Sequence, residues 1–133
     1  MTTTYWLNSI MDTMYKDNSG SFYIGLSSTL PTASGTNITE PSGNAYQRVR
    51  IGTLSAAANG VVKNSNDIQF PKSTGTWFGS SNKAKYWLLF DGNTAGAHLL
   101  SWGELSKQRI IEGDTIVTIS ANSISFTLTD SNS

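Results

Sequence analysis

The first segment of the chain carries the only clear helical period. Within residues 1–18, apolar side chains recur at the three- and four-residue spacing that places them on one face of a helix. These side chains are Leu7, Ile10, Met11 and Met14. Tyr5, Trp6 and Tyr15 widen the stripe. A threonine among residues 2–4 is expected to cap the helix, and the stretch KDNSG is expected to end it. Such an aromatic helix needs a surface to pack on, either its own domain or a neighbouring subunit.

After the helix, short apolar segments alternate with turn-forming residues. Six segments have strand character, and some hold two strands: residues 21–28, 46–52, 60–73, 84–92, 97–105 and 114–130. Residues 29–46 are rich in Thr, Ser, Gly, Pro and Asn without a period, which predicts a long loop. About seven to nine short strands separated by turns are typical of an antiparallel sandwich. We therefore predict an all-β fold, an antiparallel, jelly-roll-like β-sandwich with one N-terminal α-helix, in a single domain over 1–133. The helix covers 1–18 and the sandwich 19–130.

The densest stretch is YWLLFDGNTAGAHLLSWGEL, residues 86–105. Its continuous apolar run from Tyr86 to Phe90 suits a strand covered on both faces, by the sandwich interior and by the helix or another subunit. Asp91-Gly92-Asn93 offers the positive φ angles of a tight hairpin turn. We expect a core hairpin here, with His98 as a packed, hydrogen-bonded side chain. Residues 114–130 predict a final hairpin.

The composition narrows the classes of partner. Only 14% of the 133 residues are charged, so the surface must be covered mainly by Ser, Thr, Asn and Gly. Nine basic and nine acidic side chains cancel, and a neutral chain has no long-range field to gather nucleic acid or an anionic membrane. No apolar run reaches membrane-spanning length. We expect neither a nucleic-acid partner nor membrane insertion.

Candidate chemistry is sparse. The chain has no cysteine, which excludes disulfides, thiolate zinc sites and cysteine nucleophiles. His98 is the only histidine, and neither further ligands for a metal nor a GxSxG nucleophile accompany it. Glu40, Asp91 and the other carboxylates show no spacing typical of a glycosidase pair. Arg48 and Arg50 suit a solvated or inter-subunit face. We predict no catalytic residue, no metal site, no cofactor and a non-enzymatic protein.

The order of the segments resembles a known family. FYIGLSSTLPTASGTNITEPSGNAYQRV is similar to YxGLSxxxP followed by GTxxTEPSGxxYxR in small phage and prophage virion proteins labelled tail fibre proteins. NSNDIQFPKSTGTW, residues 86–105 and IEGDTIVTISANSISFTL continue the resemblance in the same order over residues 22–129. YWLNSIMDTMY is similar to the start of some members. The resemblance implies a virion component with a β-sandwich, built by association of copies.

Our first hypothesis is a bacteriophage virion protein of the tail fibre, tail tip or surface type. It would be made in the host bacterial cytoplasm, assemble with other virion proteins and with copies of itself, and attach to a host surface glycan. The aromatic helix supplies the candidate assembly contacts: Tyr5, Trp6, Leu7, Ile10, Met11 and Met14.

Two alternatives remain open. One is a capsid decoration protein, and the other is a carbohydrate-binding module. In the module, Trp77 and Phe78 of STGTWFGSSNK would be exposed and stack on sugar rings, while Asn82 would bind hydroxyl groups. The family has a tryptophan matching Trp77, which instead implies a structural role. A virion subunit should be a multimer, whereas a free module should be a monomer.

Overall fold

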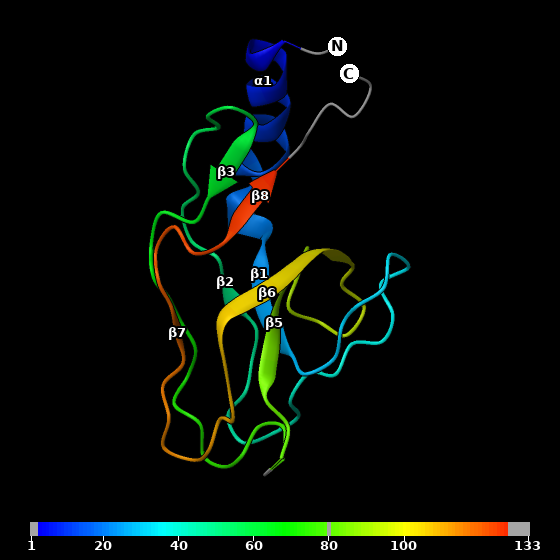
Figure 1. The fold of residues 1–133 in the computed structure, drawn as a ribbon, viewed down its shortest axis with the longest axis vertical. Coiled ribbons are helices and arrows are strands. Elements are labelled where there is room, and N and C mark those ends of the chain that lie inside the picture. Colours follow the sequence, from blue (N-terminus) through cyan, green and yellow to red (C-terminus); the bar gives the residue numbers. More distant parts are fainter. Residues whose placement is uncertain (1–2, 80, 128–133) are drawn as a thin grey trace.

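A computed structural model describes residues 3–79 and 81–127, and Figure 1 shows its elements. Every strand pair in it is antiparallel. Over the described residues, the elements are the α-helix α1 (Thr4–Met14), the 3-10 helix η1 (Lys16–Ser21), β1 (Tyr23–Ser27), β2 (Val49–Arg50), β3 (Val61–Lys63), β4 (Ile68–Gln69), β5 (Ala84–Phe90), β6 (Leu99–Arg109), β7 (Thr118–Ile119) and β8 (Ser125–Thr127). The predicted all-β sandwich with one N-terminal helix is confirmed.

The first layer is a four-stranded sheet in the order β2-β1-β5-β6. Its centre is the apolar run of β5, in which Trp87 to Phe90 are all buried. Ile24 and Leu26 of β1 lie opposite Leu89 and Trp87, and these four side chains belong to one apolar core. Burial of consecutive residues in β5 confirms that this strand is covered on both faces.

Over Phe90, the cover on the outer face of β5 comes from the chain's own loop between β1 and β2. The Arg48 guanidinium lies 3.5 Å from the centre of the Phe90 ring. The loop predicted over residues 29–46 contains no helix or strand, and it extends to residue 48, because the strand predicted over 46–52 is formed only at Val49–Arg50. The expectation that the helix or another subunit covers this side of the strand is therefore wrong over Phe90, because the loop folds back onto the sheet.

The second layer is a long, interrupted ribbon. β3 pairs with β8, and β4 pairs with β7. Beyond the β4–β7 pair the two segments remain hydrogen-bonded, because Phe70 N–H donates to Val117 O (2.9 Å) and Trp77 N–H donates to Ile111 O (3.1 Å). The predicted final hairpin is wrong, since β7 and β8 each pair with an earlier strand. The predicted strand also extends to residues 128–130, which lie outside the described residues.

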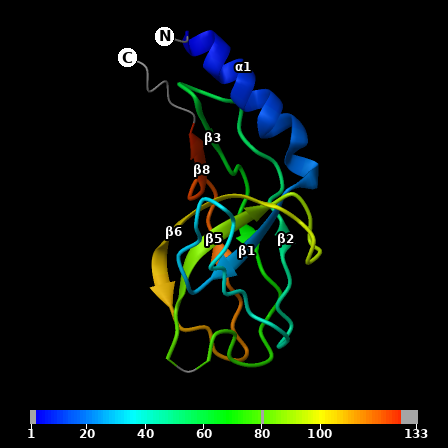
Figure 2. The same cartoon turned by 90° about the vertical axis from the view of Figure 1, so that its right-hand side faces the viewer.

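The helix lies along the end of the ribbon (Figures 1 and 2). Its Thr3 hydroxyl accepts from Trp6 N–H (3.2 Å), and Met11 enters the core. Asn8 and Asp12 accept from the backbone N–H groups of Gly60 (2.8 Å) and Ala57 (2.7 Å). The helix ends at Met14, earlier than the predicted residue 18, and a 3-10 turn replaces its last part; the predicted start at residues 1 and 2 lies outside the described residues.

The connection between β5 and β6 is longer than predicted. Gly92 and Asn93 do not adopt positive φ, so the expected tight turn is wrong. Residues 91–98 form an open loop, closed where Asp91 Oδ1 accepts from His98 N–H (2.7 Å) and Asp91 N–H donates to His98 O (3.2 Å). The Asp91 carboxylate thus holds the two ends of the loop together without the positive φ angles of a tight turn.

Candidate assembly and attachment surfaces

The helix presents an apolar row to solvent. Tyr5 is 79% exposed, Trp6 58% and Met14 49%. Trp6, Ile10 and Met14 recur every four residues and line a shallow depression with Ser9 and Thr13. We call these three side chains the helix row.

The other residues predicted to make assembly contacts differ in burial, because they lie on different sides of the helix. Met11 is 1% exposed and belongs to the core, so it is unavailable to a partner. Leu7 and Ile10 are half-buried at the edge of the docked face. The apolar stripe seen in the sequence is thus split between the protein's own core and the outer surface.

The residues predicted to stack on sugars are not on the surface. Trp77 and Phe78 are 5% and 9% exposed. The indole Nε1–H of Trp77 donates to Asn44 O (2.9 Å), and its ring packs edge-on against Tyr46 at 5.2 Å. The expected exposure of both rings is wrong, because both belong to the apolar core. Asn82 is exposed.

A partly buried polar cluster that the sequence did not reveal fixes the loops over the sheet. Glu40 and Arg48 form a two-pronged ion pair, with Arg48 Nη2 2.7 Å from Glu40 Oε1 and Arg48 Nε 3.0 Å from Oε2. The Tyr46 hydroxyl donates to Glu40 Oε2 (2.6 Å) and accepts from Leu26 N–H (3.1 Å). We call Glu40, Tyr46 and Arg48 the loop clamp. The TEPSGxxYxR spacing was the available signal for it.

The loop clamp joins two loops that are distant in sequence. Arg48 Nη1 donates to Thr94 O (2.8 Å), in the connection between β5 and β6. Burial, and after it the Glu40 carboxylate, raise the pKa of Tyr46 far above its usual range, so the hydroxyl stays protonated and keeps donating. The clamp therefore orders the loops at residues 28–48 and 91–98 as one surface.

His98 and Asp91 lie on that surface rather than in the core. The His98 side chain is 83% exposed and its Nδ1 lies 3.1 Å from Asp91 Oδ2. The expected packing of His98 is wrong. The His98 backbone N–H, and after it the His98 side chain, lower the pKa of the Asp91 carboxyl. The described residues hold no cluster of three or more metal-ligating side chains.

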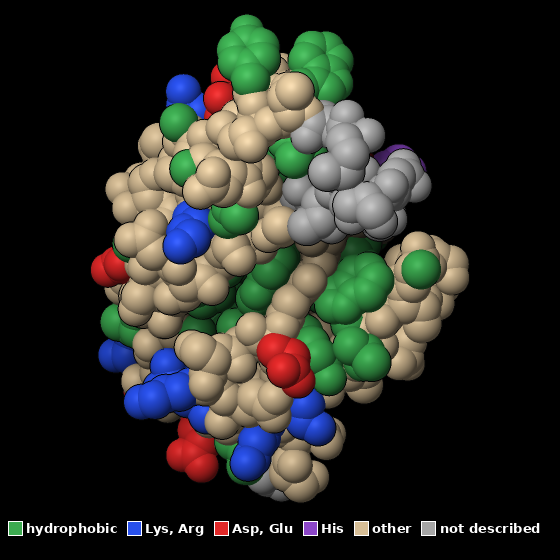
Figure 3. Space-filling view, turned by 45° about the horizontal axis from the view of Figure 1, so that its top comes forward, with side chains coloured by type: hydrophobic (Ala, Val, Ile, Leu, Met, Phe, Trp, Pro, Cys, Tyr) green, Lys and Arg blue, Asp and Glu red, His purple; other side chains and the backbone are tan. Residues whose placement is uncertain are grey.

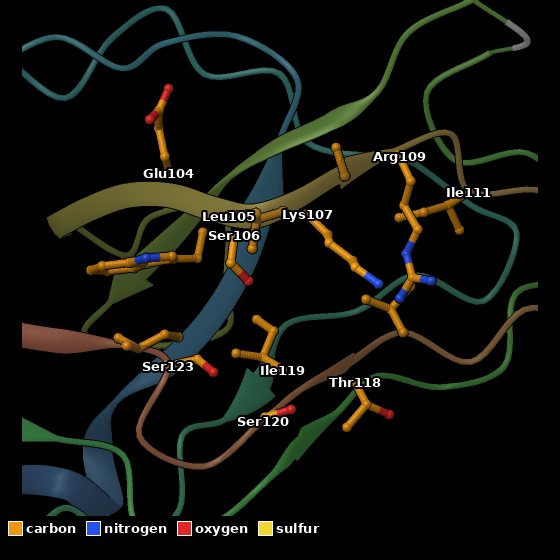
Figure 4. Close-up of a pocket in the computed structure, with 14 residues that line it drawn as sticks. Glu104, Leu105, Ser106, Lys107, Arg109, Ile111, Thr118, Ile119, Ser120 and Ser123 are labelled. Carbon is orange, nitrogen blue, oxygen red and sulfur yellow. The ribbon is translucent and has the colours of Figure 1, made fainter.

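A cleft of about 430 Å³ opens between β6 of the first layer and the β7–β8 part of the second. Figure 3 shows a hollow with hydrophobic side chains at its floor and charged side chains around it. Trp87, Leu105 and Ile119 contribute apolar surface, while Lys107 and Arg109 bring charge from β6 (Figure 4). Sequence reasoning missed this site because its residues come from strands paired with different partners.

Comparison with known families decides the wider identity. Residues 1–127 match the family model described as podophage GP4 fiber I protein gp80. The chain belongs to this Gp80 family. No curated protein matches it.

Membership of the Gp80 fibre family confirms the resemblance to phage tail fibre proteins. It assigns the chain a structural role in a phage fibre, with other virion proteins as partners and the virion as its location. In residues 3–79 and 81–127 of this Gp80-family chain, no helix is long and apolar enough to cross a bilayer.

Proposed function

We propose that this chain is a non-enzymatic subunit of a podophage fibre and that copies of it associate through the helix row. The supporting observation is that Trp6 and Met14 stay about half exposed on a helix whose opposite side is docked. Helix and sandwich act as one domain, because Met11 lies in the common core and Asn8 and Asp12 bind the sandwich backbone.

The occupant that best fits the helix row is a second copy of the same chain. A symmetric contact places similar residues of two copies together, so a charged face would repel itself. The only charged side chain of α1 is Asp12, which is turned inward to Ala57 N–H. The outer side is apolar or hydroxylated, and burying apolar surface stabilises the contact by about 25 cal/mol per Å².

The helix row is short, so a contact between two copies through it buries little surface and is weak. An α-helix of 11 residues is about 16 Å long, and a stable interface usually buries about 1,600 Å² in total. One helix pair therefore gives weak, concentration-dependent association. In a fibre, many copies held together make weak contacts effective through avidity.

The test is the mass of the protein in solution by light scattering over a concentration series. The wild type should form a multimer, and the double variant Trp6→Ser/Met14→Ser should be a monomer with unchanged circular dichroism. The matched control is Leu30→Ser/Leu100→Ser, which removes two apolar side chains of similar exposure (55% and 45%) outside the helix. This control should keep the wild-type mass. A wild type that stays monomeric, or a double variant of unchanged mass, contradicts the proposal.

The family description favours a fibre subunit over a capsid decoration protein or a free carbohydrate-binding module. A fibre subunit also has a second task, attachment to the host surface, which we include in the proposal. The helix row serves assembly, so attachment requires another surface of the molecule.

A further inference from the structure

Two exposed cationic side chains of β6 line the cleft. Lys107 and Arg109 are two residues apart on the strand, and both side chains extend toward the same part of the cleft, above Thr118 (Figure 4). Within residues 3–79 and 81–127, neither forms an ion pair or a side-chain hydrogen bond. In a chain with only 14% charged residues, two free cations that converge on one cavity need an explanation.

The surroundings strengthen the positive charge. Ala84 pairs with Arg109 across the sheet, which brings Lys83 and Lys85 to the same end of β5 and β6. Glu104 is the acidic residue of the cleft lining, and its carboxylate points away from the cleft in Figure 4. The cleft is therefore suited to an anion and not to a cation.

The rest of the lining matches a saccharide. Hydroxyl groups that can bond to sugar hydroxyls border the cavity, from Ser106, Thr118, Ser120 and Ser123. Leu105 and Ile119 provide apolar surface for the C–H face of a ring. Ligand sites typically combine an apolar wall with a few placed polar groups that fix orientation.

We infer that this cleft binds a saccharide carrying a carboxylate or a phosphate, with Lys107 and Arg109 holding the anionic group. This inference rests on the proposed attachment role. The planar guanidinium of Arg109 can bind two oxygens of either group at once, and the Lys107 ammonium adds a point charge.

The test uses isothermal titration calorimetry of the full chain with three soluble probes. Trigalacturonic acid carries carboxylates, mannose 6-phosphate carries a phosphate, and maltotriose is neutral. Binding of either anionic probe, weakened by added salt because the charges are screened, is expected. The two anionic arms distinguish a uronic acid from a phosphorylated sugar. Maltotriose should not bind.

The variants Lys107→Gln and Arg109→Gln should each weaken binding of the anionic probe by about tenfold, since each removes a charge-assisted hydrogen bond. The matched control is Lys16→Gln, an exposed lysine outside the cleft, which should bind as the wild type does. Light scattering of all variants should give the wild-type mass. Calorimetry thus tests ligand binding by the cleft, and light scattering tests assembly through the helix row independently.

Three results overturn the inference. They are equal binding of maltotriose, no binding of either anionic probe, or unchanged affinity in both glutamine variants. Inward-pointing charges also protect edge strands from unwanted pairing. Aggregation of Lys107→Leu and Arg109→Leu variants that still bind the anionic probe normally would assign the two cations to that role alone.

Discussion

At the residue scale, Gly25 permits the loop clamp to exist. A Cβ atom on Gly25 would lie 2.8 Å from both Glu40 Oε2 and the Tyr46 hydroxyl oxygen. The Tyr46 hydroxyl donates a hydrogen bond to this carboxylate oxygen and accepts one from Leu26 N–H, so neither oxygen can move away without losing a partly buried hydrogen bond. The glycine of YIGLS and the Glu, Tyr and Arg of TEPSGNAYQR therefore form one structural unit.

This unit predicts a specific cost for a small substitution. Gly25→Ala should lower the free energy of unfolding by about 1–3 kcal/mol, because it overpacks a closed site. The measurement is urea unfolding followed by tryptophan fluorescence. Gly20→Ala is the matched control, since a Cβ there has no neighbour within 4 Å. A loss of stability equal in both variants would show that Gly25 is not held by contact with the clamp.

At the scale of elements, Asn64 keeps the ribbon of the second layer continuous where its strands stop. It is fully buried, and its side chain donates to Asn66 O (2.9 Å) and Ser120 O (3.1 Å) while accepting from Ile124 N–H (2.9 Å). Its backbone also bonds across to Ile124 and Asn122. Between the β3–β8 pair and the β4–β7 pair, hydrogen bonds of the Asn64 side-chain amide thus take the place of the backbone hydrogen bonds of a continuous sheet.

Removing that amide should loosen the second layer. Asn64→Ala leaves the buried Ile124 N–H and two partly buried carbonyl groups without this partner, and an unsatisfied buried group costs about 1–3 kcal/mol. We expect a loss of about 2–4 kcal/mol in unfolding free energy, together with faster amide hydrogen exchange at Ile119 and Phe126. Asn66→Ala, at an exposed neighbouring position, is the control and should change little. Normal exchange in Asn64→Ala would contradict this role.

At the scale of the whole molecule, the helix row and the charged cleft share no residue. α1 lies at one end of the molecule (Figure 1), and residues of β6 line the cleft. An assembly surface separate from a ligand surface lets many copies present their clefts together. Association then multiplies weak binding to a surface that carries many ligands.

This separation predicts two different responses to the loss of assembly. The Trp6→Ser/Met14→Ser variant should bind a soluble anionic saccharide with wild-type affinity in calorimetry. On a sensor densely coated with the same saccharide, its apparent affinity should fall by about a hundredfold, because avidity is lost. Arg109→Gln should lose affinity in both formats. Equal losses of the helix variant in both formats would show that the two surfaces are coupled.

The sequence by itself determined the classes of element and their apolar faces. The helix was predicted from the stripe of Leu7, Ile10, Met11 and Met14. A strand buried on both sides was predicted from the unbroken apolar run Tyr86–Phe90. These predictions succeed because local periodicity reflects which side chains must leave water. The family resemblance came from ordered motifs in the same way and was confirmed by the family match.

Tertiary structure alone decided which strands pair and which charged groups meet. β8 pairs with β3 and not with its neighbour β7. Glu40 forms an ion pair with Arg48 and lies against Gly25. Lys107 and Arg109 extend toward Thr118 (Figure 4). Trp77 was expected to be exposed and is buried, whereas His98 was expected to be packed and is exposed. Partner choice depends on how all apolar faces are buried together, and a local pattern states only that a face must be covered.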